Sequence, residues 1–284
     1  MIAIVGMGST GAYLASILME SGQQVVSLDY RYSNSPLETR EIWENERHLQ
    51  IAYEKVNLLH PDCQLIIVSC KTMDINVGLI DSLLSEDTNV LFMQNGVSKF
   101  KKLSALSDKF LFGTLAGLES RRDGNLIRVL TTNPCLSFYT KSPELASFFR
   151  NLNHDTLLFR NTENLYSPLV SKFPRWFISS AIMMLGNGPL GISKLKIPRE
   201  EILLACKEVA DYMNVLFGVE VNQEAIVQEI LSLPDRLTTS AFRDYSEGKP
   251  NEWTLEWVSA VENLSKALLS SRTLEMWGER ILNG

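Results

Sequence analysis

The chain has 284 residues, of which 45% are hydrophobic, so it can bury a large core, and its length favours two domains. Its formal net charge of −6 excludes a general attraction for nucleic acid or an anionic membrane surface. Four scattered cysteines and three histidines, without C-x-x-C or H-x-x-x-H spacing, argue against a zinc site, a disulfide framework and a histidine-based triad.

Short apolar runs alternate with helical patterns in the first half of the chain. Residues 2–5 predict a buried strand, residues 10–21 a helix that stops at Gly22, and residues 25–28 a second strand that ends at Asp29. Further strands are predicted over residues 64–70, 89–93 and 110–115. Strands that alternate with helices predict a doubly wound parallel α/β sheet.

The pattern changes after about residue 160. Long helical periodicities cover residues 200–218 and 252–282, and strand signals become rare. We therefore predict an α/β domain over residues 1–160 and a mainly α-helical domain over residues 161–284.

A glycine-rich turn follows the first predicted strand and opens the first predicted helix. The residues Gly6, Met7, Gly8, Ser9, Thr10 and Gly11 match G-x-G-x-x-G in this required context. In such a turn the first glycine permits the bend, the second lets the backbone approach a pyrophosphate, and the third lets the helix pack on the strand. The helix N-terminus adds free N–H groups and a partial positive charge. The turn therefore predicts a dinucleotide-binding, Rossmann-type domain.

The end of the second predicted strand carries two conflicting signals. Asp29 follows Gly11 by 18 positions, where an acidic side chain bonds the ribose 2′-hydroxyl of NAD. Arg31 lies two residues later and is able to neutralise the 2′-phosphate of NADP. Both cofactors stay open on these residues alone.

Further segments occur in an order that resembles one known family. Lys71 closes the third core strand, Asn95-Gly96 follows the next one, and Arg121–Asn125 follows Gly113-Thr114. Near the C-terminus, the family's signature spacing is matched by Ser240, Asp244, Gly248 and Glu252. Together with the glycine turn, these residues make the chain resemble the ketopantoate reductase (2-dehydropantoate 2-reductase) family from end to end.

The resemblance implies NADPH-dependent reduction of ketopantoate to pantoate, in pantothenate and coenzyme A biosynthesis. It implies that Lys172 donates the proton and that Glu252 orients this lysine and keeps it charged. Asn95 and Ser240 match positions that bind the substrate carboxylate. Lys71 matches a lysine near the cofactor ribose, and Asn95 is also counted with the cofactor-binding residues. NADP(H) is thus favoured by the resemblance, while Asp29 keeps NAD(H) open.

The chain departs from the family at the helix that carries Lys172. The family's asparagines four and eight residues after the lysine are replaced by Trp176 and Ser180. Pro174 is tolerated only in the first turn of a helix, which predicts either that the helix begins nearer Lys172 or that the acid lysine is placed differently. These departures put the substrate in doubt and leave the oxidoreductase interpretation intact.

Three alternatives therefore stay open. One is a reductase of the same family that acts on another keto acid, which Trp176 and Ser180 favour. Another is an NAD-dependent hydroxyacid dehydrogenase, which Asp29 favours. The third, from a different class, is a non-catalytic NADP-binding regulatory protein; the retention of Lys172, Ser240 and Glu252 argues against it.

The setting of the protein is also predicted. No basic leader with a cleavage site opens the sequence, and no apolar stretch reaches the ~20 residues of a membrane span, so we expect a cytoplasmic protein. We expect a small keto-acid substrate, no nucleic-acid or membrane partner, no metal, and a homodimer as one possible assembly. The active site is expected between the two domains, beyond the carboxyl ends of the strands.

Overall fold

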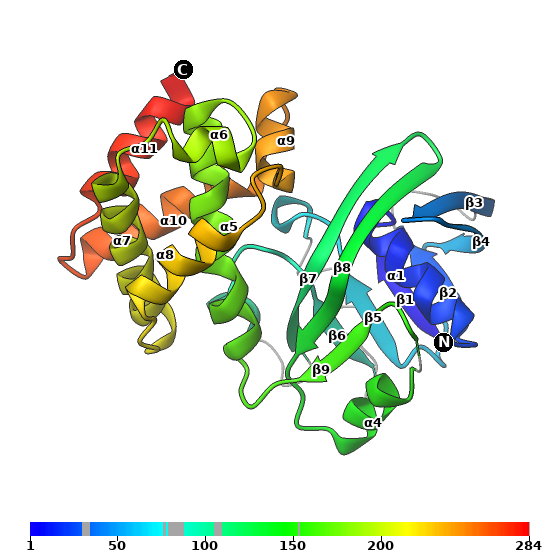
Figure 1. The fold of residues 1–284 in the computed structure, drawn as a ribbon. Helices are drawn as coiled ribbons and strands as arrows, with labels where there is room; N and C mark the ends of the chain where they lie inside the picture. The colour runs from blue at the N-terminus through cyan, green and yellow to red at the C-terminus, as the bar shows by residue number, and fades with distance from the viewer. Residues whose placement is uncertain (30–34, 76–77, 79–87, 105–109, 153, 284) are drawn as a thin grey trace. The chain divides into compact units, whose positions relative to one another are not determined.

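The computed structural model describes residues 1–29, 35–75, 78, 88–104, 110–152 and 154–283. Its contacts divide the chain into two compact units (Figure 1). The first contains Met1–Gln94 and Lys102–Pro168, and the second contains Asn95–Lys101 and Leu169–Gly284. The loop that follows the fourth core strand therefore belongs to the second, helical unit.

The first unit is built on a mixed sheet. Its strands are β1 (Ile2–Val5), β2 (Val25–Leu28), β3 (Ser35–Glu44), β4 (Arg47–Val56), β5 (Leu65–Val68), β6 (Asn89–Phe92), β7 (Phe110–Asp123), β8 (Leu126–Phe138) and β9 (Leu158–Asn161). Its helical segments are α1 (Ser9–Glu20), η1 (Thr72–Asp74) and α4 (Pro143–Asn151), while α3 (Phe100–Ser104) lies across the division between the units. The predicted strands at residues 2–5 and 25–28 and the helix after the glycine turn are confirmed.

The centre of this sheet is parallel, as predicted. In the order β4-β2-β1-β5-β6-β7, each strand pairs in parallel with the next. The chain runs from β1 to β2 on one side and later returns to β5 on the other side. This reversal places the carboxyl ends of β1 and β5 at the topological switch point, where ligands bind in open α/β sheets.

The prediction of a plain doubly wound sheet is wrong in one respect, because the sheet closes on itself. β3 pairs antiparallel with β4, β8 pairs antiparallel with β7, and β3 also pairs in parallel with the first half of β8. The second half of β8 pairs with β9. An unpaired strand edge is a liability, and the two long hairpins remove it by pairing with each other.

Helix α1 lies inside this ring of strands. It contacts β1 and β2 as well as β3, β4, β7 and β8. Every residue from Gly11 to Leu18 is buried, and Figure 1 shows the helix beside these strands. A helix that is covered on all sides needs small and apolar residues all round, which explains the sequence Gly-Ala-Tyr-Leu-Ala-Ser-Ile-Leu.

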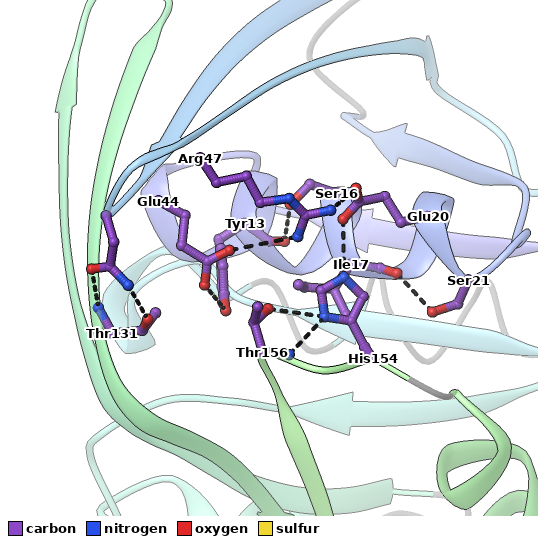
Figure 2. Close-up of polar contacts among 11 residues, drawn as sticks. Tyr13, Ser16, Ile17, Glu20, Ser21, Glu44, Arg47, Thr131, His154 and Thr156 are labelled. Atoms are coloured by element: carbon purple, nitrogen blue, oxygen red, sulfur yellow. Dashed lines mark hydrogen bonds and ion pairs between the residues drawn. The ribbon is translucent and has the colours of Figure 1, made fainter.

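The interior of the ring also contains charged groups. The hydroxyl of Tyr13 on α1 donates a 2.8 Å hydrogen bond to Oε1 of Glu44, which is 2% exposed. Figure 2 shows that Arg47 lies between Glu44 and Glu20, and that Glu20 also contacts the ring of His154. These polar contacts tie the enclosed helix to the β3–β4 hairpin and to the segment before β9.

The second unit is helical. Its elements are α5 (Ser167–Gly186), α6 (Leu190–Lys194), α7 (Arg199–Phe217), α8 (Gln223–Ser232), α9 (Ser240–Ser246), α10 (Glu252–Lys266) and α11 (Arg272–Asn283). The helix predicted over residues 200–218 is confirmed. The periodic segment over residues 252–282 is two helices, because the chain breaks at Leu268, whose φ is 58°. No helix among the described residues is long and apolar enough to cross a membrane.

Helix α5 begins earlier than its proline suggests. It starts at Ser167 and continues through Pro174, so the prediction that it begins near Lys172 is wrong. Pro174 has no N–H group and leaves one backbone carbonyl of the preceding turn without its helical partner. Packing compensates: Phe173 stacks on Phe177, and Phe177 stacks on Trp253 of α10, whose indole N–H donates to the Phe177 carbonyl at 2.9 Å.

Candidate active site

The glycine turn packs tightly at two of its three glycines. Gly6 has a φ of 94°, and a Cβ atom there would lie 2.6 Å from the backbone nitrogen of Cys70. A Cβ atom on Gly11 would overlap the carbonyl oxygen of Gly6, which also accepts a 2.7 Å hydrogen bond from Ser69 Oγ. The fold itself therefore requires glycine at both positions, because the turn lies against the end of β5.

No contact among the described residues requires a glycine at position 8. Gly8 is exposed, and a Cβ atom there would lie farther than 4 Å from every heavy atom of the described residues, its own chain neighbours aside. It is also the N-cap residue of α1, where no side chain caps the helix. The first-turn N–H groups of α1 are thus left to an external acceptor, and a phosphate group that approaches the backbone explains the glycine. The residues present fit a dinucleotide pyrophosphate.

The other cofactor candidates follow the core strands. The part-buried Asp29 continues β2, and its N–H donates to Val56 of β4 at 2.9 Å. Lys71 follows β5 and immediately precedes η1. Gln94 holds this region together, since its amide donates to the carbonyls of Val68 and Cys70 at 2.9 and 3.0 Å. Arg31 lies outside the described residues, so the choice between Asp29 and Arg31 stays a prediction.

Lys172 and Glu252 come together in the second unit. Lys172 is part-buried on α5, and Glu252, 8% exposed, is the first residue of α10. The pKa of Lys172 is lowered to about 8, mainly by burial and also by the neighbouring charge of Arg175, while the charge of Glu252 acts in the opposite direction. A cation with a pKa near neutrality, beside a carboxylate, is suited to donate a proton.

Asn95 lies on a loop that α10 also holds. The loop residues Val97 and Ser98 each donate a backbone hydrogen bond of 2.9 Å to the same carboxylate oxygen of Glu256. Ser98 Oγ donates to the other oxygen at 2.6 Å. A Cβ atom on Gly96 would overlap this carboxylate, so the Asn95-Gly96 sequence needs its glycine for space.

Ser240 lies at the start of α9. It is exposed and follows Thr239, the N-cap residue, whose Oγ1 accepts from the N–H of Phe242 at 3.2 Å. Thr239 Oγ1 also accepts a 2.9 Å hydrogen bond from Ser180 of α5. The beginning of α9 is thus tied to the helix that carries Lys172, one residue away from Ser240.

The two residues that replace the family's asparagines have different environments. Ser180 is fully buried and donates to the carbonyl of Trp176 at 2.7 Å as well as contacting Thr239, so the protein itself satisfies its hydroxyl. Trp176 is 6% exposed, and its buried indole N–H has no hydrogen-bond partner among the described residues. Its ring lies 6.0 Å from that of Phe173.

Sequence reasoning missed Glu256 and Arg175. An isolated carboxylate or guanidinium on a helical pattern resembles a solvated charge, which is the more common case. The available signal was the spacing of Glu252 and Glu256, because residues four apart lie on one helix face. Among the described residues, no group of three His, Cys, Asp or Glu side chains gathers as a metal site.

Known proteins are similar to this chain in part of the sequence and in the fold. Residues 2–134 match the family model of ketopantoate reductase PanE/ApbA. No curated protein matches the sequence. Several solved structures are similar over almost the whole chain, at identities that show the fold alone.

One is a ternary structure of D-mandelate dehydrogenase with NADH and anilino(oxo)acetate, with a TM-score of 0.83 and 15% identity over 99% of this chain and 97% of that one. Another is the dimeric ketopantoate reductase of Staphylococcus aureus, with a TM-score of 0.77 and 18% identity over 99% and 97%. A third is 2-dehydropantoate 2-reductase of Geobacter metallireducens, with a TM-score of 0.74 and 17% identity over 99% of both chains.

Proposed function

Because residues 2–134 belong to the ketopantoate reductase family of NAD(P)-dependent oxidoreductases, we propose that this chain reduces the ketone of a small 2-keto acid. The observation that carries the proposal is the lowered pKa of the part-buried Lys172, on which the charge of Glu252 acts. A part-buried lysine whose pKa is lowered to about 8 can hold its proton and release it near neutral pH.

Each candidate residue has a defined task in this proposal. The turn Gly6–Gly11 holds the pyrophosphate at the N-terminus of α1, and the nicotinamide supplies a hydride for the carbonyl carbon when it is bound. Lys172 gives its proton to the ketone oxygen as negative charge develops there, and Glu252 keeps the ammonium charged and oriented. Asn95 and Ser240 bind the substrate carboxylate, and Lys71 binds the cofactor ribose.

Ketopantoate with NADPH is the first pair to test. The test follows oxidation of NADPH and of NADH by absorbance, with ketopantoate and a panel of 2-keto acids. Turnover with any of them supports the reductase, and the faster cofactor decides between Asp29 and Arg31. Cofactor binding without turnover of any keto acid would reject the reductase and favour the regulatory alternative.

Substitution of the acid provides the mechanistic control. We expect Lys172→Ala to lower kcat by at least about 100-fold, the usual contribution of a general acid, while the dissociation constant of NADPH stays the same. Unchanged turnover would remove Lys172 from the mechanism.

The surroundings of Trp176 favour a second candidate substrate class. The Ser180 hydroxyl is engaged with Trp176 and Thr239 in its buried site, whereas Trp176 offers an aromatic face and an indole N–H that pairs with none of the described residues. An asparagine at each position would instead offer two amides to a hydroxylated substrate. A 2-keto acid with an apolar or aryl side chain fits such a pocket. The similarity to D-mandelate dehydrogenase supports the same class.

Paired substrates test this class. We expect 3,3-dimethyl-2-oxobutanoate, which is ketopantoate without its hydroxyl, and phenylglyoxylate to show higher kcat/KM than ketopantoate. Trp176→Phe keeps an aromatic ring but removes the N–H group together with the five-membered part of the indole, and it should raise KM for the preferred acid at least about tenfold, the value of one buried hydrogen bond. Trp43→Phe, at an exposed tryptophan of β3, is the matched control. A clear preference for ketopantoate would reject the apolar class.

A further inference from the structure

The turn that follows β6 is fastened to a single buried carboxylate. Glu256 is 0% exposed and accepts three hydrogen bonds from this turn: from the Val97 and Ser98 backbone at 2.9 Å each, and from Ser98 Oγ at 2.6 Å. Charged acceptors make stronger hydrogen bonds than neutral ones. These three donors lie in an irregular segment, outside any helix or strand, and Glu256 provides their acceptors.

The helix that carries Glu256 also carries Glu252, the carboxylate that acts on Lys172. Glu252 lies four residues before Glu256, so both carboxylates project from one face of α10. The charge of Glu252 acts on Lys172, while Glu256 holds the turn that begins at Asn95. All these residues belong to the second unit, and a rigid helix fixes the separation between the two carboxylates.

We propose that Glu256 is the positioning residue of the active site, which holds the Asn95–Ser98 turn in register with Lys172 and Glu252. Glu256 acts through Asn95 and does not touch the substrate. The inference deepens the proposed function and rests on it for its effect on turnover, whereas the tie between helix and turn can be measured without any substrate.

The buried environment of the Glu256 carboxylate makes its hydrogen bonds to the turn sensitive to pH. The pKa of Glu256 is raised to about 7, mainly by burial and also by the charge of Glu252, while the hydrogen bonds from Ser98 and Val97 act in the opposite direction. From α7, Tyr212 faces the same region, and the charge of Glu256 contributes to the raised pKa of its phenol. Below neutrality the protonated carboxyl group loses its charge-assisted bonds, and the turn is held less tightly.

The first test measures amide hydrogen exchange of the full chain without ligand. In Glu256→Gln we expect Val97 and Ser98 to exchange about tenfold faster, equivalent to one lost hydrogen bond, while the amides of α7 keep their rates. Ser98→Ala, which removes one donor, should give a smaller increase, and Glu220→Gln at an exposed position should give none. Unchanged exchange at Val97 and Ser98 in Glu256→Gln would overturn the proposal.

The second test measures kinetics with the keto acid that the wild type turns over. We expect Glu256→Gln to raise KM for the keto acid about tenfold, to leave KM for the dinucleotide unchanged, and to abolish the acid-side fall of kcat/KM. Equal losses for both substrates, or a retained acid-side fall, would overturn the positioning role. Absence of turnover in the wild type would reject the proposed function, and the exchange rates would then still decide whether Glu256 positions the turn.

Discussion

At the scale of a single residue, the protonation of Lys172 makes the proposed reduction depend on pH. Its lowered pKa means that it is protonated below about pH 8 and loses its proton above this value. Since the reduction needs the protonated form, we expect kcat to fall as the pH rises through about 8. Glu252→Gln removes the charge that raises the lysine pKa, so the fall should move to lower pH. A fall at the same pH in both proteins would contradict this pairing.

Glu256 should also leave a signature in stability. Its pKa is raised in the folded protein, so its contribution to the unfolding free energy is complete below the unfolded pKa near 4.5 and is lost as the pH rises through about 7. Relative to the wild type, Glu256→Gln should therefore gain stability between pH 5 and pH 8, by roughly 3 kcal/mol at most. Urea unfolding at both pH values measures this change, and a pH-independent difference would contradict it.

Substitutions at two glycines of the turn should separate an effect on stability from an effect on dinucleotide binding. A methyl group on Gly8 meets no protein atom, so Gly8→Ala should keep the melting temperature and weaken dinucleotide binding at least about tenfold, because the backbone can no longer approach the phosphates. Gly11→Ala overlaps the Gly6 carbonyl and should cost about 1–3 kcal/mol of stability, as overpacking does. Thermal melting and dinucleotide titration distinguish the two variants. Full binding by Gly8→Ala would exclude the phosphate site.

At the scale of elements, α1 depends on polar contacts inside the ring of strands. The buried Oε2 of Glu44 has an ion-pair contact with Arg47 at 4.0 Å but accepts no hydrogen bond from the described residues, so the bond from Tyr13 to the other oxygen is important. We expect Tyr13→Phe to lower the unfolding free energy by about 1–3 kcal/mol, because it leaves a buried acceptor unsatisfied. In Tyr13→Phe/Glu44→Gln the loss should be less than the sum of the single losses, as measured by urea unfolding. Additive losses would show that the two residues do not cooperate.

The same buried charges explain which elements the sequence could predict. β1, β2 and α1 carry continuous apolar patterns and were predicted within one residue. β3 and β4 were not predicted, because their buried face includes Arg40 and Glu44, which interrupt the alternation of apolar and polar residues. The two terminal nitrogens of Arg40 donate to Asn125 and Glu38, and Asn125 lies 85 residues away in sequence, so no local pattern reveals the pairing.

At the scale of the whole molecule, the candidate site combines residues that differ in how far sequence predicts them. The glycine turn is predictable because its proposed chemistry is local: the six residues expected to bind one group follow one another in the sequence. Lys172 and Glu252 lie 80 positions apart in the printed sequence and stand out only through the family resemblance. The role of Glu256 could not be predicted from the sequence. Its partners Val97 and Ser98 are 159 and 158 positions away. Two of the three bonds use backbone groups, which every residue other than proline has.

The enclosure of α1 also dictates an order of events as the chain is made. A helix cannot enter a ring of strands that has already closed, so α1 must settle on β1 and β2 before β3 meets β8. The N-terminal segments leave the ribosome first, and β8 begins only at Leu126. Until then the nascent chain carries β3 with an open edge that nothing covers. During much of its synthesis the protein therefore exposes an unpaired strand edge, and only later residues of the same chain can pair with it.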